Sequence, residues 1–192
     1  GSVDGSLTFS QYLTLKNLKS LIENVSLGKL KNREFSLDFL KEVHKELYEK
    51  VDEDYAGKFR AIDSEIQRHS LFDNPNSVFP DFDEIENFYL INQKFNQPLL
   101  LAMELVYKIL IMKPFSVGNE RVAFVIFNFL LHKSGYPLIV FEGTNLNFST
   151  FREAMDTQPE VNSKNKLFKW LLQQVSDGLR IVTAEISTKN EE

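Results

Sequence analysis

Apolar residues recur at helical spacing through most of the chain. In residues 9–24 and 37–50 they fall three or four positions apart, as expected for a helix with one face on a core. Residues 99–112 and 121–134 are apolar on nearly every side, which predicts a buried central pair of helices. The pattern therefore predicts a mainly helical protein. Further helices are expected over residues 81–94, 148–156 and 166–186.

Residues at the ends of these segments favour the same boundaries. Ser36 is a favourable N-cap for the segment that follows it. Asn96 or Gln97 caps the first helix of the central pair, with Pro98 at the first helical position. Gly135 is a residue type that commonly follows the last turn of a helix. Within the central pair we expect burial of Phe124, Ile126, Phe127 and Leu130.

One segment breaks the helical pattern. Residues 57–80 lose the helical period, and residues 59–66 alternate in a way that suggests a short β-hairpin arm. The far side of this arm, residues 73–77, is rich in turn-forming residues. We therefore expect an all-α fold that carries one small β-hairpin.

Length and composition are typical of one globular domain spanning residues 1–192. The chain has 192 residues, 43% of them hydrophobic, and a domain of this size buries about 70% of its unfolded surface. Residues 1–8 are expected to be a tag remnant with a flexible start, and residues 187–192 a flexible tail.

Charge and cysteine content exclude several classes of function. The net charge of −5 argues against nucleic acid as the main partner, because phosphate binding favours a basic face. The chain has no cysteine, which rules out disulfides and thiol catalysis and favours an intracellular, cytoplasmic location. The longest apolar run, residues 122–127, is far too short to span a bilayer, so no membrane contact is expected.

The segment between the two central helices carries the candidate chemistry. It reads Lys-Pro-Phe-Ser-Val-Gly-Asn-Glu-Arg over residues 113–121. A Gly118-Asn119 turn that opens a helix presents unpaired backbone N–H groups and the positive end of the helix dipole. These features favour anion binding.

This loop resembles the signature of the Fic family, H-P-F-x-[D/E]-G-N-G-R-x-x-R. Other parts of the chain are similar to the family in the same order, over roughly residues 15–185. The resemblance implies a Fic-fold helical domain with a β-hairpin flap at residues 57–80. The family transfers AMP from ATP to protein hydroxyls, or moves related phosphate-containing groups. The matching segments are Ser-Leu-Ile-Glu-Asn at 20–24, the helix of Phe39 to Leu47 with His44, Ala-Gly-Lys-Phe-Arg at 56–60, Val-Phe-Pro at 78–80 and Gly-Tyr-Pro-Leu-Ile-Val at 135–140.

Several residues that carry chemistry in the family are changed here. Lys113 takes the place of the histidine that accepts the proton of the target hydroxyl, and roughly one ordinary lysine in 2,500 is neutral at pH 7. Its expected role is to hold a phosphate or carboxylate, with proton abstraction as the weaker alternative. Val117 replaces the magnesium-binding carboxylate and offers no oxygen ligand. Phe124 replaces the second phosphate-binding arginine.

Other loop residues keep the family's scaffold. The resemblance implies that Pro114 and Phe115 shape the loop, and that the first residues of the next helix bind nucleotide. Glu120 departs from the family's glycine, and is expected either as an acidic first-turn residue or as a substitute metal ligand. The expected nucleotide-binding residues are Gly118, Asn119, Glu120 and Arg121.

The segment around Glu23 resembles the family's inhibitory helix, expected here over residues 9–26. In the family its glutamate pairs with the second motif arginine, which is Phe124 in this chain. Two interpretations of Glu23 remain open. It is either a surface carboxylate or the partner of Lys113 or Arg121, and we expect the second arrangement in the folded protein.

Two classes of function follow from these observations. The first is a degenerate Fic-domain protein that acts by binding or regulation, contacting a protein target or regulatory partner through the flap. The alternative is an active transferase that uses the substituted residues, with ATP and magnesium as cofactors. A toxin controlled by a partner protein is a third class. The three histidines match no zinc-ligand spacing, so no resident metal is expected.

Overall fold

A computed structural model describes residues 8–61, 81–139 and 162–189. All regular elements in these three ranges are helices, so the predicted all-α class is confirmed. The predicted hairpin beyond residue 61 and the predicted helix at 148–156 lie outside the described residues. The helices are α1 (Phe9–Ser26), α2 (Leu37–Tyr48), α3 (Asp83–Asn92), α4 (Pro98–Met112), α5 (Asn119–Lys133) and α7 (Asn162–Lys189).

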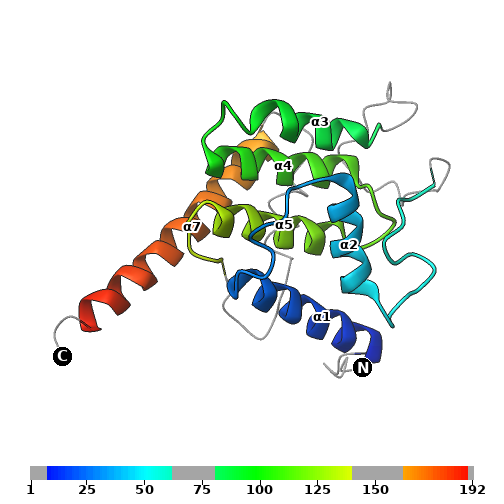
Figure 1. The fold of residues 1–192 in the computed structure, drawn as a ribbon, viewed down its shortest axis with the longest axis horizontal. Coiled ribbons are helices and arrows are strands. Elements are labelled where there is room, and N and C mark those ends of the chain that lie inside the picture. The colour runs from blue at the N-terminus through cyan, green and yellow to red at the C-terminus, as the bar shows by residue number, and fades with distance from the viewer. Residues whose placement is uncertain (1–7, 62–80, 140–161, 190–192) are drawn as a thin grey trace.

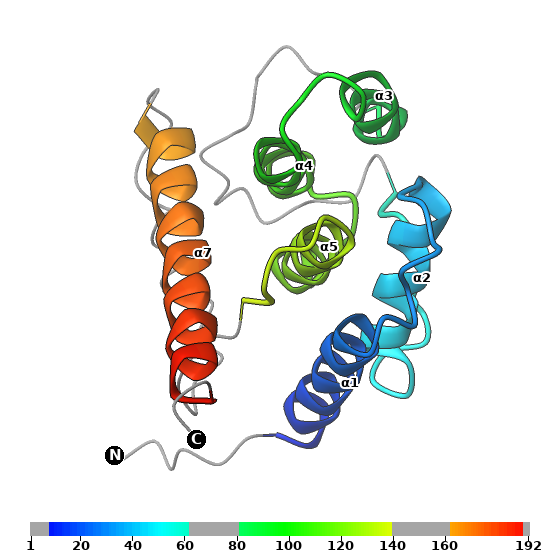
Figure 2. The same cartoon turned by 60° about the vertical axis from the view of Figure 1, so that its left-hand side comes forward.

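Helix α5 lies at the centre of the fold, with the other helices around it (Figures 1 and 2). α4 lies beside it, and these two helices make the most extensive contact of any pair in the described residues. α3 packs on the outer side of α4, while α1 and α2 contact α5 from another direction. α7 packs against α4 on the remaining side, and its C-terminal end extends beyond the other helices (Figure 1).

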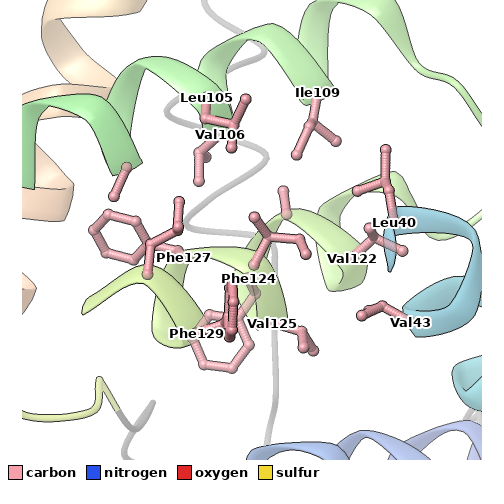
Figure 3. Close-up of a cluster of buried hydrophobic side chains, with 14 of the residues drawn as sticks. Leu40, Val43, Leu105, Val106, Ile109, Val122, Phe124, Val125, Phe127 and Phe129 are labelled. Atoms are coloured by element: carbon pink, nitrogen blue, oxygen red, sulfur yellow. The ribbon is translucent and has the colours of Figure 1, made fainter. Parts of the chain in front are cut away.

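The central position of α5 follows from its sequence. Every residue from Val122 to Leu131 is buried, so the helix has no face that remains in water. A helix that is apolar all round must be covered by neighbours on all sides. Figure 3 shows Phe124, Val125, Phe127 and Phe129 pointing in different directions from α5 into the surrounding core. The predicted burial is confirmed, with exposures of 7% for Phe124, 0% for Ile126, 1% for Phe127 and 6% for Leu130.

The helix ends agree with the sequence prediction to within a few residues. The Ser36 hydroxyl accepts a hydrogen bond from the Phe39 N–H at 3.1 Å, so this N-cap is confirmed. Gln97 is the N-cap of α4, and Pro98 occupies the first turn as expected. α5 ends at Lys133, and Gly135 then adopts a left-handed φ of 80°, which reverses the chain.

One buried amide fixes the path of the chain after α5. The Asn128 side chain is fully buried, and its Oδ1 accepts a hydrogen bond from the Ile139 N–H at 2.7 Å. Its Nδ2 donates to the carbonyl of Phe124 one turn earlier. A buried polar group needs such partners, because leaving it unpaired costs free energy. Asn128 therefore holds the segment ending at Ile139 along α5.

Hydropathy gives no support for a membrane-spanning helix in the described part of the chain, since none of its helices combines the required length with sufficient apolar content.

Replacing Phe127 with alanine should strongly destabilise the protein. Its ring is 1% exposed in the core around α5, and removing such a ring leaves a cavity. The expected loss in the free energy of unfolding is about 3–5 kcal/mol, measured by denaturant titration. As a matched control, Phe95→Ala removes the same ring from a position that is 82% exposed, and should change stability by less than about 0.5 kcal/mol. Similar effects of the two substitutions would contradict the burial of Phe127.

Candidate functional site

The candidate site is the loop that joins α4 to α5. α4 ends at Met112 and is followed by the capping residue Lys113, whose φ of 44° lies in the left-handed region. α5 begins after Gly118, whose φ is 75°. The Asn119 side chain closes the loop with two hydrogen bonds to Phe115. Its Oδ1 accepts from the Phe115 N–H at 3.0 Å, and its Nδ2 donates to the Phe115 carbonyl at 2.8 Å. Asn119 therefore shapes the loop rather than presenting its amide to a ligand.

His44 on α2 contacts the loop and helps to hold it in place. Its Nδ1 accepts a hydrogen bond from the Gly57 N–H at 2.9 Å, which requires this nitrogen to be unprotonated. The proton is thus assigned to Nε2, which donates to the Val117 carbonyl at 3.1 Å. Burial lowers the pKa of His44 from 6.5 to about 4, although the hydrogen bond to Val117 acts in the opposite direction. His44 is therefore neutral at pH 7 and joins three separate parts of the chain.

A stack of aromatic rings fixes the same arrangement. The His44 ring is nearly parallel to the Phe115 ring, with centroids 3.9 Å apart. Tyr48 packs on the other side of His44 at 4.7 Å, and Phe59 contacts Phe115 at 5.4 Å. Phe115 is buried, so this close packing anchors the loop in the core. Pro114 beside it is also buried.

Gly118 is required by two features of this packing. Its positive φ is unfavourable for residues that carry a Cβ atom. A Cβ atom at this position would also lie 2.1 Å from the Tyr48 hydroxyl oxygen, well inside van der Waals contact. The Tyr48 ring thus occupies the space that a side chain would need, which explains the glycine independently of any ligand.

Arg121 extends from the first turn of α5 toward α2. Its Nη1 donates a hydrogen bond to the Tyr48 hydroxyl at 3.2 Å. Burial raises the pKa of Tyr48, with Arg121 opposing the shift, so the phenol stays protonated at pH 7. The arginine is consequently held at the start of α5, close to the N–H groups that this helix end leaves without intrahelical partners.

The remaining loop side chains differ in their exposure. Lys113 and Glu120 are half-buried, and neither has an ion pair within the described residues. Val117 is 44% exposed and contributes only its carbonyl, which His44 already engages. The solvent-facing edge of the loop, here called its rim, thus carries the Lys113 ammonium, the Glu120 carboxylate and the exposed Val117 side chain.

Phe124 lies away from this rim. It is 7% exposed and lines a small apolar hollow in the core between α4, α5 and α7. Figure 3 shows it among the core side chains of α5. The position that carries a phosphate-binding arginine in the family therefore belongs to the hydrophobic core in this chain.

The predicted ion pair between Glu23 and the loop is wrong. Glu23 is 59% exposed and pairs with Lys19 one turn earlier on α1, at 3.7 Å. α1 turns Leu18, Leu21 and Val25 toward the core, which directs Glu23 to solvent. The contact on which the inhibitory assignment of Glu23 depended is therefore missing among the described residues.

Sequence reasoning missed two residues that shape the site. Tyr48 was not selected, although it lies four positions after His44 and therefore on the same helix face. Arg60 was noted only as part of the Ala-Gly-Lys-Phe-Arg match. Its Nε donates a 2.7 Å hydrogen bond to the Lys113 carbonyl, which only the tertiary structure reveals.

The buried neutral His44 should make stability depend on pH. The unfolded chain protonates His44 near pH 6.5, whereas the folded protein resists protonation until about pH 4. Lowering the pH through this window therefore favours unfolding, by up to about 3 kcal/mol, and the stabilisation is fully present above pH 6.5. Urea titrations from pH 7.5 to 4.5 should show a larger loss for the wild type than for His44→Gln. His132→Gln, on the half-buried end of α5, is the matched control and should follow the wild type. Equal slopes for the wild type and His44→Gln would contradict this account.

Comparison with known proteins agrees with the helical fold described above. The family model described as Fic/DOC family matches residues 34–131, a span that contains both His44 and the loop. A search of the curated proteins finds no match. The structure is similar to a Fic domain containing signaling protein from Bacteroides thetaiotaomicron, with a TM-score of 0.67 and 20% identity, over 100% of this chain and 77% of that one.

A fragment of Fic-1 from C. elegans is similar as well, with a TM-score of 0.65 and 16% identity. The match covers 100% of this chain but 56% of that fragment, so the chain spans just over half of its length. At these identities the solved structures establish the fold, and the family model adds the match in sequence. Because that model covers just over half of the 192 residues, including the loop between α4 and α5, the chain belongs to the Fic/DOC family.

Proposed function

We propose that this Fic-domain protein acts by binding or regulation, and that its capacity to transfer AMP is lost or strongly weakened. The proposal rests on a contrast within the loop. Asn119, His44 and Arg60 hold the loop backbone by hydrogen bonds, while the family resemblance implies that several side chains that perform chemistry in the family are replaced. A binding role accounts for both features.

Burial of Phe124 is the observation that carries the proposal. The family uses an arginine here to hold phosphate, but Phe124 sits in the core with Val106, Phe127 and Trp170 nearby. Its ring cannot replace a guanidinium, and turning it outward would expose a large apolar surface. The loop therefore lacks the second of the two arginines that bind phosphate in the family.

The side chains of the loop do not fit the family's magnesium site. Magnesium favours oxygen ligands in near-octahedral geometry, and Val117 supplies none from its side chain. Glu120 is the only carboxylate in residues 113–121, and the described residues contain no cluster of three potential metal ligands. We therefore derive no catalytic step that uses magnesium.

Lys113 is poorly suited to the role of the family's histidine. An ammonium group is a hydrogen-bond donor without an acceptor site, whereas proton abstraction needs a free lone pair. A phosphate near the loop would stabilise the charged form further. Lys113, Arg121 and the first N–H groups of α5 instead provide positive charge suited to holding an anion.

The binding role has two components. The start of α5, at Gly118 to Arg121, would hold a nucleotide or another phosphate-bearing ligand. The segment after residue 61 would contact a protein partner by strand addition, as the family's flap does. This segment lies outside the described residues, so that part of the proposal comes from the family resemblance.

An active transferase is the second candidate, favoured by one observation. Glu120 is half-buried on the first turn of α5 and has no ion pair within the described residues, so its carboxylate is available to a cation. If it replaced the lost carboxylate, the loop would regain one metal ligand. The missing guanidinium at Phe124 would still reduce the rate.

We expect no metal-dependent transfer of label when the protein is incubated with labelled ATP and magnesium or manganese. Calorimetric titration with ATP should detect binding that weakens when Arg121 is replaced by glutamine. Robust labelling by the unmodified protein would refute the proposal in favour of the active transferase. The absence of any ATP binding would refute the nucleotide-binding component.

Restoring the histidine alone should not restore transfer. Lys113→His supplies a general base, which typically raises the rate about 10²–10⁴-fold. It does not supply the metal ligand missing at Val117 or the phosphate-binding arginine missing at Phe124. Stabilisation of the transferred phosphate depends mainly on positioning and charge, so these two losses should dominate. The assay is the same label transfer, with Lys169→His on the exposed face of α7 as the matched control.

The combined variant Lys113→His, Val117→Asp, Glu120→Gly and Phe124→Arg restores all four changed positions at once. This variant should transfer more label than Lys113→His if the loop backbone holds the four side chains in positions that support transfer. Substantial labelling by Lys113→His alone would show that Val117 and Phe124 are not limiting.

A further inference from the structure

We propose that Arg60 is a positioning residue that sets the backbone of the loop and couples it to residues 57–61. This inference rests on the proposed function, because it concerns regulation of the same ligand-binding loop. Arg60 lies beside the loop, where its backbone and its side chain both contact the end of α4.

Arg60 contacts the end of α4 through both its backbone and its side chain. Its N–H donates to the Pro114 carbonyl at 2.9 Å, and its Nε donates to the Lys113 carbonyl at 2.7 Å. A longer contact of 3.4 Å joins Nη2 to the Met112 carbonyl. These three consecutive carbonyls lie at the C-terminal end of a helix, where acceptors lack intrahelical partners and a cation is favoured by the dipole.

The loop conformation needs this support. Lys113 has φ 44° and ψ 65°, a left-handed conformation that a residue with a Cβ atom rarely adopts. It also precedes Pro114, and a following proline restricts the backbone further. A charged hydrogen bond to the Lys113 carbonyl stabilises this unfavourable geometry. Without it, Lys113 is free to relax toward an extended conformation, which would redirect its ammonium group.

A second set of hydrogen bonds also joins the residues before Arg60 to the loop. The Gly57 N–H bonds to His44, which in turn bonds to the Val117 carbonyl on the opposite side of the loop. The chain from Gly57 to Arg60 is thus fastened to both ends of the loop. A ligand that stabilises the loop should therefore stabilise residues 57–61, and a change that stabilises residues 57–61 should stabilise the loop by the same coupling energy.

Amide hydrogen exchange measured by NMR tests this coupling without requiring a known ligand. In Arg60→Met we expect the amides of Lys113 and Phe115, which bond to Ile109 and Asn119, to exchange about tenfold faster or more. Amides in the middle of α5, such as Phe127, should keep their rates. Arg60→Lys retains the positive charge but loses the planar guanidinium group, and should accelerate exchange to an intermediate extent.

Arg180→Met is the matched control, because Arg180 is 77% exposed and pairs only with Asp177 among the described residues. It should leave the exchange of Lys113 and Phe115 unchanged. A purely structural role for Arg60 would accelerate all slow amides together, including Phe127, and would overturn the proposal. Unchanged exchange at Lys113 and Phe115 in Arg60→Met would overturn it as well.

A parallel experiment with ATP separates this inference from the proposed function. If ATP binds the wild type, its addition should slow exchange of the Arg60 amide, and Arg60→Met should bind ATP more weakly by about fivefold or more. Binding without these two effects would overturn the coupling. If ATP does not bind at all, the nucleotide-binding proposal fails, while the exchange rates of the ligand-free variants still decide the role of Arg60.

Discussion

Burial of every residue from Val122 to Leu131 in α5 is the constraint on which the rest of the structure depends. A helix with apolar residues on every side is stable in water only if other helices surround it, and α1, α2, α4 and α7 take those places. This packing fixes where α5 begins. The loop before it must then connect the end of α4 to a helix whose position is already determined, which explains its two left-handed residues and its tight hydrogen bonding.

The loop is held by side-chain contacts to its backbone. The Asn119 amide, the neutral His44 imidazole and the Arg60 guanidinium each satisfy backbone groups of the loop. Such contacts keep their value for folding whether or not the protein transfers AMP. The shape of the loop in this Fic/DOC protein therefore depends on Asn119, His44 and Arg60, and not on the exposed side chains of the loop.

Much of the fold was predictable because it depends on local pattern. The helices, the Ser36 cap and the burial of Phe127 follow from apolar spacing and from the chemistry of helix ends. The site was predictable in part, since the loop resembles the family motif from Lys113 to Arg121. The predicted pairing of Glu23 with the loop is wrong. The direction of a side chain on α1 depends on which face of that helix packs against α2 and α5.

The sequence by itself determined the helical class and the family. These depend on residue type and spacing, which are local properties. Only the tertiary structure decided that Arg60 bonds to Lys113, that Tyr48 fills the space beside Gly118, and that Phe124 belongs to the core. Each of these contacts joins residues distant along the chain or depends on how separate helices pack, and local periodicity carries no information about such distances.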